Sequence, residues 1–129
     1  MRVRTPAALL LCLLACGCGK KKSTDELIAD LKSPQEGERI RAVRLLPQRK
    51  EDAAQVVPAL IEALKGKEGD VRWGAAIGLG SFGEQAKDAI PALQAAQRDR
   101  DARVREAAGV ALSRIDPTRF PAPSKPRGK

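Results

Sequence analysis

Paired carboxylates are the first side chains in this 129-residue sequence that could do chemistry. Asp25 stands beside Glu26 and Glu51 beside Asp52, and two neighbouring carboxyl groups can serve as general acid and general base. The chain has no histidine, so the commonest general base and the commonest zinc ligand are missing. Both pairs also lie where a helix is expected to begin, and the helix dipole favours negative charge there. We therefore interpret the pairs as helix N-terminal charge, and expect no catalytic residue, no metal site and no cofactor.

Four glycines follow one another closely at positions 74, 78, 80 and 83. Their spacing does not match that of a glycine-rich loop that cradles phosphate groups. The distance between two packed helices depends on the side chains at their contact. We interpret these glycines as points where helices approach each other closely, and expect no nucleotide site.

The N-terminal segment has the layout of a secretory signal peptide. Arg2 and Arg4 precede an uncharged apolar run over residues 7–16, and three lysines follow at positions 20–22. This order of charge, apolar run and small residues is typical of an export signal. The run is too short to cross a bilayer, which takes about 20 helical residues. We expect the protein to be exported rather than membrane-spanning.

Cys16 is the residue with the most specific predicted chemistry. Residues 13–16 read Leu-Leu-Ala-Cys and resemble the bacterial lipobox, in which cleavage occurs before the cysteine. That resemblance implies diacylglycerol on the thiol of Cys16 and acylation of its new amino group. Cys18 is a second possible site, but the residues before it fit the motif less well. Cys12 would leave with the signal peptide.

The mature chain is expected to be a membrane-anchored lipoprotein on the periplasmic or cell-surface side. Gly17, in place of an aspartate after the lipidated cysteine, favours the outer membrane if the cell is diderm. Residues 17–22 reach at most about 20 Å, which would keep the folded domain close to the membrane. Lys20–Lys22 could contact anionic headgroups or form a solvated spacer.

The positive charge of the chain lies outside its central part. The net charge is +8, but residues 24–116 carry 15 basic and 16 acidic side chains. A nearly neutral domain with one tryptophan, two phenylalanines and no tyrosine does not offer the basic, aromatic surface that nucleic-acid binding uses. We therefore do not expect nucleic acid as a partner.

Residues recur every 33 positions, without gaps, through the middle of the chain. The recurring sets are Leu27, Leu60 and Leu93; Arg39, Arg72 and Arg105; Ala42, Ala75 and Ala108; and Leu46, Leu79 and Leu112. A fixed period of this length indicates a solenoid, in which each unit buries an apolar face against its neighbours. The spacing within each unit predicts two helices.

Capping signals mark where these helices should begin and end. Ser23 and Glu26 fit a capping box, while Pro58 and Pro91 are predicted to occupy first-turn positions, where proline costs no hydrogen bond. Pro117 should end the last helix. We expect four parts: a signal peptide over residues 1–15, a lipid anchor and basic tether over 16–22, repeats over 23–116, and a disordered, proline-rich basic tail over 117–129.

Short motifs distinguish between repeat families. Val-Pro-Ala-Leu at 57–60 recurs as Ile-Pro-Ala-Leu at 90–93, and Val-Arg at 71–72 recurs at 104–105. Ankyrin and tetratricopeptide motifs use a histidine and a tyrosine, which this chain lacks. The units resemble the short HEAT-like repeat of the phycobilin lyase type, although Glu38 replaces the valine in the first unit. The resemblance implies an all-α fold, a short right-handed α-solenoid of three HEAT-like helix pairs.

Trp73 is the leading candidate for contact with a partner. It lies about 200° around its helix from the core face predicted for Val71, Ala75 and Leu79. In HEAT-like arrays the second helices line the concave surface, and aromatic residues and arginine are enriched at interface hot spots. Trp73 could instead pack between repeats. The predicted partner-binding ridge on successive second helices consists of Ile40, Arg44, Trp73, Ile77 and Val110.

These features favour a lipid-anchored module that binds another protein, of unknown identity, at a bacterial membrane surface. Some relatives of this repeat class attach bilins to proteins, which implies a lyase-like catalyst or an accessory subunit of an enzyme as the alternative. No catalytic residue of those relatives can be matched here, so we expect a non-enzymatic protein. A passive structural spacer is the third hypothesis.

Overall fold

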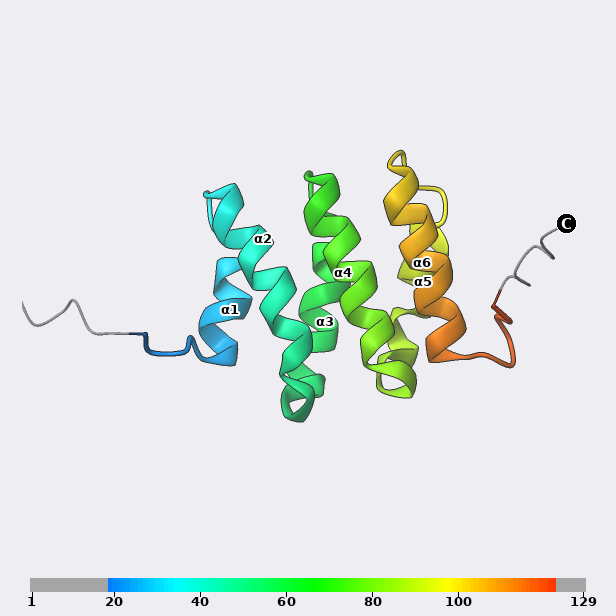
Figure 1. Ribbon diagram of the computed structural model, residues 1–129, viewed down its shortest axis with the longest axis horizontal. Coiled ribbons are helices and arrows are strands. Elements are labelled where there is room, and N and C mark those ends of the chain that lie inside the picture. Colours follow the sequence, from blue (N-terminus) through cyan, green and yellow to red (C-terminus); the bar gives the residue numbers. More distant parts are fainter. Residues whose placement is uncertain (1–18, 123–129) are drawn as a thin grey trace, which may run out of the picture.

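The computed structural model describes residues 19–122, and Cys12, Cys16 and Cys18 lie outside this range. Residues 19–122 contain six α-helices and no strand. The helices are α1 (Thr24–Asp30), α2 (Glu36–Leu45), α3 (Ala53–Ala63), α4 (Gly69–Ser81), α5 (Ile90–Ala96) and α6 (Ala102–Ile115). They form three stacked pairs, with α2, α4 and α6 in one layer and α1, α3 and α5 in the other (Figure 1). The predicted all-α solenoid of three helix pairs is confirmed.

The first helix begins as the sequence predicts. The Ser23 hydroxyl accepts a hydrogen bond from the Glu26 amide at 3.2 Å, and the Glu26 carboxylate accepts one from the Ser23 amide at 2.7 Å. This reciprocal capping box satisfies two amides that a helix start leaves without partners. Asp101 caps α6 in a simpler way, since its carboxylate accepts a hydrogen bond from the Arg103 amide at 2.9 Å.

The prediction that Pro58 occupies a first turn is wrong. Helix α3 begins at Ala53, so Pro58 lies inside it, whereas Pro91 does lie in the first turn of α5. Val56 and Val57 are 0% and 5% exposed, and their burial favours helix upstream of the proline. Pro58 itself is exposed, where the missing amide hydrogen bond costs least.

The core consists of the recurring apolar residues. Leu27, Leu60 and Leu93 from the first helices are each at most 1% exposed, as are Leu46, Leu79 and Leu112 from the second helices or the turn after them. Fully burying one leucine contributes about 1.5–3 kcal/mol. The predicted repeat columns are therefore the structural core of the array.

The central helix α4 packs unusually closely against its neighbours. A Cβ atom at Gly74 would lie 2.7 Å from Val43 Cγ1, and one at Gly80 would lie 2.9 Å from Ala111 Cα. Both distances are too short for real side-chain contacts. Gly74 thus admits α2 and Gly80 admits α6, which confirms the packing role of these two glycines. The prediction is wrong for Gly83, which follows α4 with a positive φ of 56° and where a Cβ atom would have its nearest neighbour at 3.9 Å.

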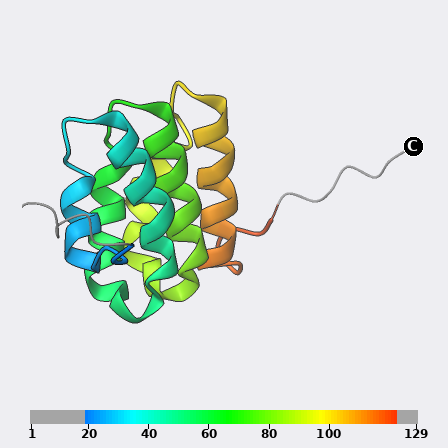
Figure 2. The same cartoon turned by 60° about the vertical axis from the view of Figure 1, so that its left-hand side comes forward.

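The folded part of the chain extends past the predicted boundary at Asp116. The Phe120 amide donates a hydrogen bond to the Asp116 carbonyl oxygen at 2.9 Å, and the half-buried Phe120 ring packs against the core. Burial of this ring holds the first residues after α6 against the array. Figure 2 shows the stacked layers from a second direction.

Candidate partner-binding groove and inter-repeat arginine ladder

Helix α4 exposes a single stripe to solvent beyond its first turn. Trp73 is half-buried, and Ile77 and Ser81 are exposed, whereas the other residues from Val71 to Gly80 are buried. The stripe residues are four positions apart in the sequence, so each lies about one turn beyond the previous one on the same side of the helix. Ile77 is 39% exposed and is the one large hydrophobic side chain of residues 19–122 that solvent reaches to this extent.

The stripe borders a groove between α2 and α4 with a volume of about 370 Å³. The wall from α2 and the turn after it consists of Val43, Arg44 and Pro47. The floor and the opposite wall of the groove come from α4 and consist of Trp73, Gly74, Ile77, Gly78 and Ser81. Because Gly74 and Gly78 have no side chains, they leave a shallow floor between the two helices. The groove is mainly apolar, with Arg44 and Ser81 as its polar side chains.

The structure brings three of the five predicted ridge residues together. Arg44, Trp73 and Ile77 line the same groove. Ile40 is half-buried on α2, one turn before Arg44, and Val110 is half-buried on α6. Neither of these two side chains lines the groove. Trp73 also packs against the core cluster, so it combines an inter-repeat contact with a partly accessible edge.

A second cavity of about 490 Å³ lies between α1 and α3. Its apolar lining includes Ile28, Leu31 and Ala59, and the ion pair of Arg39 with Glu68 borders it. The Arg39 side chain is 11% exposed, and its Nε atom is the one buried side-chain nitrogen or oxygen of residues 19–122 without a hydrogen-bond partner.

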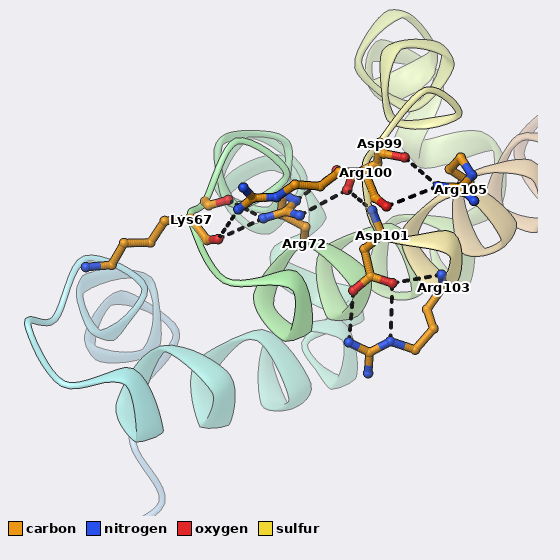
Figure 3. Close-up of polar contacts among 8 residues, drawn as sticks. Lys67, Arg72, Asp99, Arg100, Asp101, Arg103 and Arg105 are labelled. Atoms are coloured by element: carbon orange, nitrogen blue, oxygen red, sulfur yellow. Dashed lines mark hydrogen bonds and ion pairs between the residues drawn. The ribbon is translucent and has the colours of Figure 1, made fainter.

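Arg72 joins the second unit to the third. Its Nε and Nη2 atoms donate to the two carboxylate oxygens of Asp99 at 2.8 and 3.0 Å, and Nη1 donates to the carbonyl oxygens of Gly66 and Lys67 (Figure 3). Its side chain is 8% exposed, and such two-pronged pairs fix geometry as well as charge. The guanidinium hydrogen bonds hold the pKa of the Asp99 carboxyl below its ordinary value.

Arg39 makes the same kind of contact between the first unit and the second. It forms an ion pair with Glu68 and donates to the carbonyl oxygen of Ser33 in its own loop. The hydrogen bond from Arg39 lowers the pKa of Glu68. We call this series of arginines the inter-repeat ladder. The arginine column is visible in the sequence at a fixed 33-residue period, but its role in joining the units was not predicted.

Lys50 joins neighbouring units at the opposite end of the helices. Its Nζ atom donates to the carbonyl oxygen and the hydroxyl of Ser81 at 2.7 and 2.8 Å. It also lies 4.1 Å from the centre of the Phe82 ring, a cation–π contact. Partial burial lowers the pKa of the Lys50 ammonium group. This contact holds the C-terminal end of α4, next to the groove.

Comparison with known proteins identifies the fold family. The family of HEAT repeats matches residues 24–117. No curated protein matches the sequence. None of the helices in residues 19–122 has the length and apolar character needed to span a bilayer.

Among solved structures, one similar chain belongs to the complex of CpcE and CpcF of phycocyanin lyase from Nostoc sp. PCC7120. It shares 28% sequence identity with this chain at a TM-score of 0.68, over 77% of this chain. The matched part spans 39% of that lyase chain, so the similarity concerns a portion of the larger protein. The repeat columns, the stacked helix pairs and the family match agree: this chain belongs to the HEAT-repeat family.

Proposed function

We propose that this protein is a lipid-anchored HEAT-repeat module that binds another protein through the groove between α2 and α4. The observation that carries the proposal is the apolar groove itself, where an exposed Ile77 and a half-buried Trp73 face Arg44. Tryptophan and arginine are the residues most enriched at interface hot spots. An exposed apolar patch beside an arginine suits a partner that inserts an apolar side chain into the groove and offers a hydrogen-bond acceptor to Arg44.

The groove is also held rigidly, which favours binding. Glycine-mediated contacts fix α2 against α4, and Lys50 secures the end of α4 through Ser81. A surface that does not reorganise on binding loses less free energy to ordering. The groove would therefore present the same shape before and after a partner arrives.

The lipid anchor at Cys16 belongs to the same proposal. The lipobox-like residues 13–16 support it, and several acyl chains would hold the protein firmly, at roughly 0.8 kcal/mol per buried CH₂ group. Lys22 forms an ion pair with Asp30 at 2.6 Å. Lys20 and Lys21 are exposed and form no ion pair within residues 19–122, so they are the tether lysines proposed to contact headgroups. The anchor would place the array within a short distance of the membrane, on its periplasmic or cell-surface side.

Cell fractionation with intact-mass analysis tests the anchor. We expect wild-type protein in the membrane fraction, with a mature chain that starts at Cys16 and carries added acyl mass. Cys16→Ala protein should leave that fraction, whereas Cys18→Ala should remain in it. A Cys16→Ala protein that still fractionates with membranes would reject the anchor.

The second candidate function is an accessory subunit of an enzyme, or a lyase-like catalyst. The similarity to a chain from the phycocyanin lyase complex favours it. Purified protein that carries a covalently or tightly bound pigment, visible in its absorption spectrum, would support this alternative over a simple binding module.

Affinity purification from solubilised native membranes tests the groove. Ile77→Asp places a charge in the apolar groove and should abolish recovery of a co-purifying protein. Gln94→Asp is the matched control, since Gln94 is exposed on α5 in the other helix layer. Equal recovery by both variants would reject the groove and favour a passive spacer.

A further inference from the structure

The inter-repeat ladder is incomplete at the C-terminal end of the array. Arg39 and Arg72 each pair with a carboxylate of the following unit. Arg105 occupies the same repeat position, and its Nη1 atom donates only to carbonyl oxygens of its own loop, at 2.8 Å to Asp99 and 3.2 Å to Arg100 (Figure 3). Within residues 19–122 it forms no ion pair, and its side chain is exposed.

The surface around Arg105 is equivalent to one that already binds a helix. On α4 the face formed by Arg72, Ala76 and Gly80 is buried beneath α6, where a Cβ at Gly80 would meet the Ala111 backbone. One repeat later, the equivalent face of α6 consists of Arg105, Gly109 and Ser113. Arg105 is exposed and the other two are half-buried. These small residues would let another helix approach as closely as α6 approaches α4.

Arg105 lies near the start of α6, and within residues 19–122 the chain leaves α6 at the other end of that helix (Figure 1). Beyond that end, Phe120 packs against the core. Residues 1–18 and 123–129 contain no aspartate or glutamate, so they offer Arg105 no side-chain carboxylate.

A second copy of this chain does not match the site either. Glu68 and Asp99, which pair with the ladder arginines, correspond in the first unit to Gln35 and Ser33 at the 33-residue period. Neither carries a charge, so a second copy cannot repeat the pairing at these two positions, although the exposed Glu36 lies next to Gln35. We take the two uncharged positions to favour a different protein, and a second copy is one outcome of the test.

We propose that the α6 end face, formed by Arg105, Gly109 and Ser113, docks a second helical-repeat protein. The loop before one of its helices would supply an acidic residue that pairs with Arg105, as Asp99 pairs with Arg72. This goes beyond the proposed function, because the face lies at the end of the array and not in the groove between α2 and α4. The two surfaces can fail or succeed independently.

Site-specific photocrosslinking in native membranes tests the proposal. A benzophenone amino acid at position 113 of the full chain should form an adduct with a protein other than this one. Peptide mapping should place the adduct in a helical repeat, near a loop with an aspartate or glutamate. Arg105→Gln should reduce the adduct yield by about tenfold or more, since a desolvated charge pair loses one partner. Arg98→Gln, an exposed arginine nearby in the chain that is outside the ladder, should leave the yield unchanged.

A charge swap separates the proposed pair from an effect on folding. Arg105→Glu should abolish the adduct, and replacement of the mapped acidic residue by arginine in the partner should restore it. Three results would overturn the proposal: no adduct above background, an adduct with a second copy of this chain, or equal yields from Arg105→Gln and wild type. A charge swap that fails to restore the adduct would also overturn it.

Discussion

Alanine in place of Gly80 would push α4 away from α6. The new Cβ atom would lie 2.9 Å from the Ala111 Cα atom and 3.1 Å from its Cβ atom. The first of these is backbone, so one of the two helices must move as a whole. Overpacking of this kind costs about 1–3 kcal/mol.

Gly109→Ala is the matched control. Gly109 also lies inside a helix, but a Cβ atom there would have as its nearest neighbour the flexible Gln97 side chain, at an ordinary 3.7 Å. Both substitutions gain about 1 kcal/mol from the higher helix propensity of alanine. The difference in the free energy of unfolding between the two variants therefore isolates the steric cost, and should be about 1–3 kcal/mol in favour of Gly109→Ala.

Urea unfolding and thermal melting of residues 19–122, both followed by circular dichroism, measure this difference. For a domain of this size about 1 kcal/mol shifts the melting temperature by roughly 4–8 °C. Gly109→Ala should melt above wild type, and Gly80→Ala at least about 4 °C below Gly109→Ala. Equal melting temperatures for the two variants would refute the close contact between α4 and α6.

Two further stability predictions follow from the core and the ladder. Leu60 is 0% exposed, so Leu60→Ala should lower the free energy of unfolding by about 2–5 kcal/mol; an unchanged urea midpoint would reject its place in the core. The pKa of Asp99 lies below its ordinary 3.8, so its pair with Arg72 stabilises the fold above that pH and loses this effect as the pH falls through the lowered value. The melting temperature of the Asp99→Asn variant should thus differ from that of wild type near neutral pH, and the two melting temperatures should converge in acid. A difference in melting temperature that stays constant below pH 3.8 would contradict the ion pair.

Periodicity predicted the core, and periodicity together with the short motifs predicted the fold. Leu27, Leu60 and Leu93 could be aligned because each unit buries the same position against its neighbours. The capping box of Ser23 with Glu26 was equally predictable, since it depends on residues three apart. Such local and periodic signals need no knowledge of tertiary contacts.

The features that the sequence did not reveal depend on contacts between units. Pro58 suggested a first turn, but burial of Val56 and Val57 extends α3 upstream. The ladder was missed because its acids do not follow the period: Glu68 and Asp99 occupy different positions of their units. Trp73 was placed on the correct side of its helix, but its half-buried state depends on the groove that Gly74 and Gly78 create.

The affinity of the purified partner for Trp73→Ala protein tests the central claim most directly. If the groove between α2 and α4 is the docking surface, the loss of this side chain should weaken binding by about 2 kcal/mol, or roughly 30-fold. The melting temperature should change little, because Trp73 is only half-buried. Unchanged affinity, or a variant that fails to fold because Trp73 is an essential inter-repeat contact, would contradict the assignment of the groove.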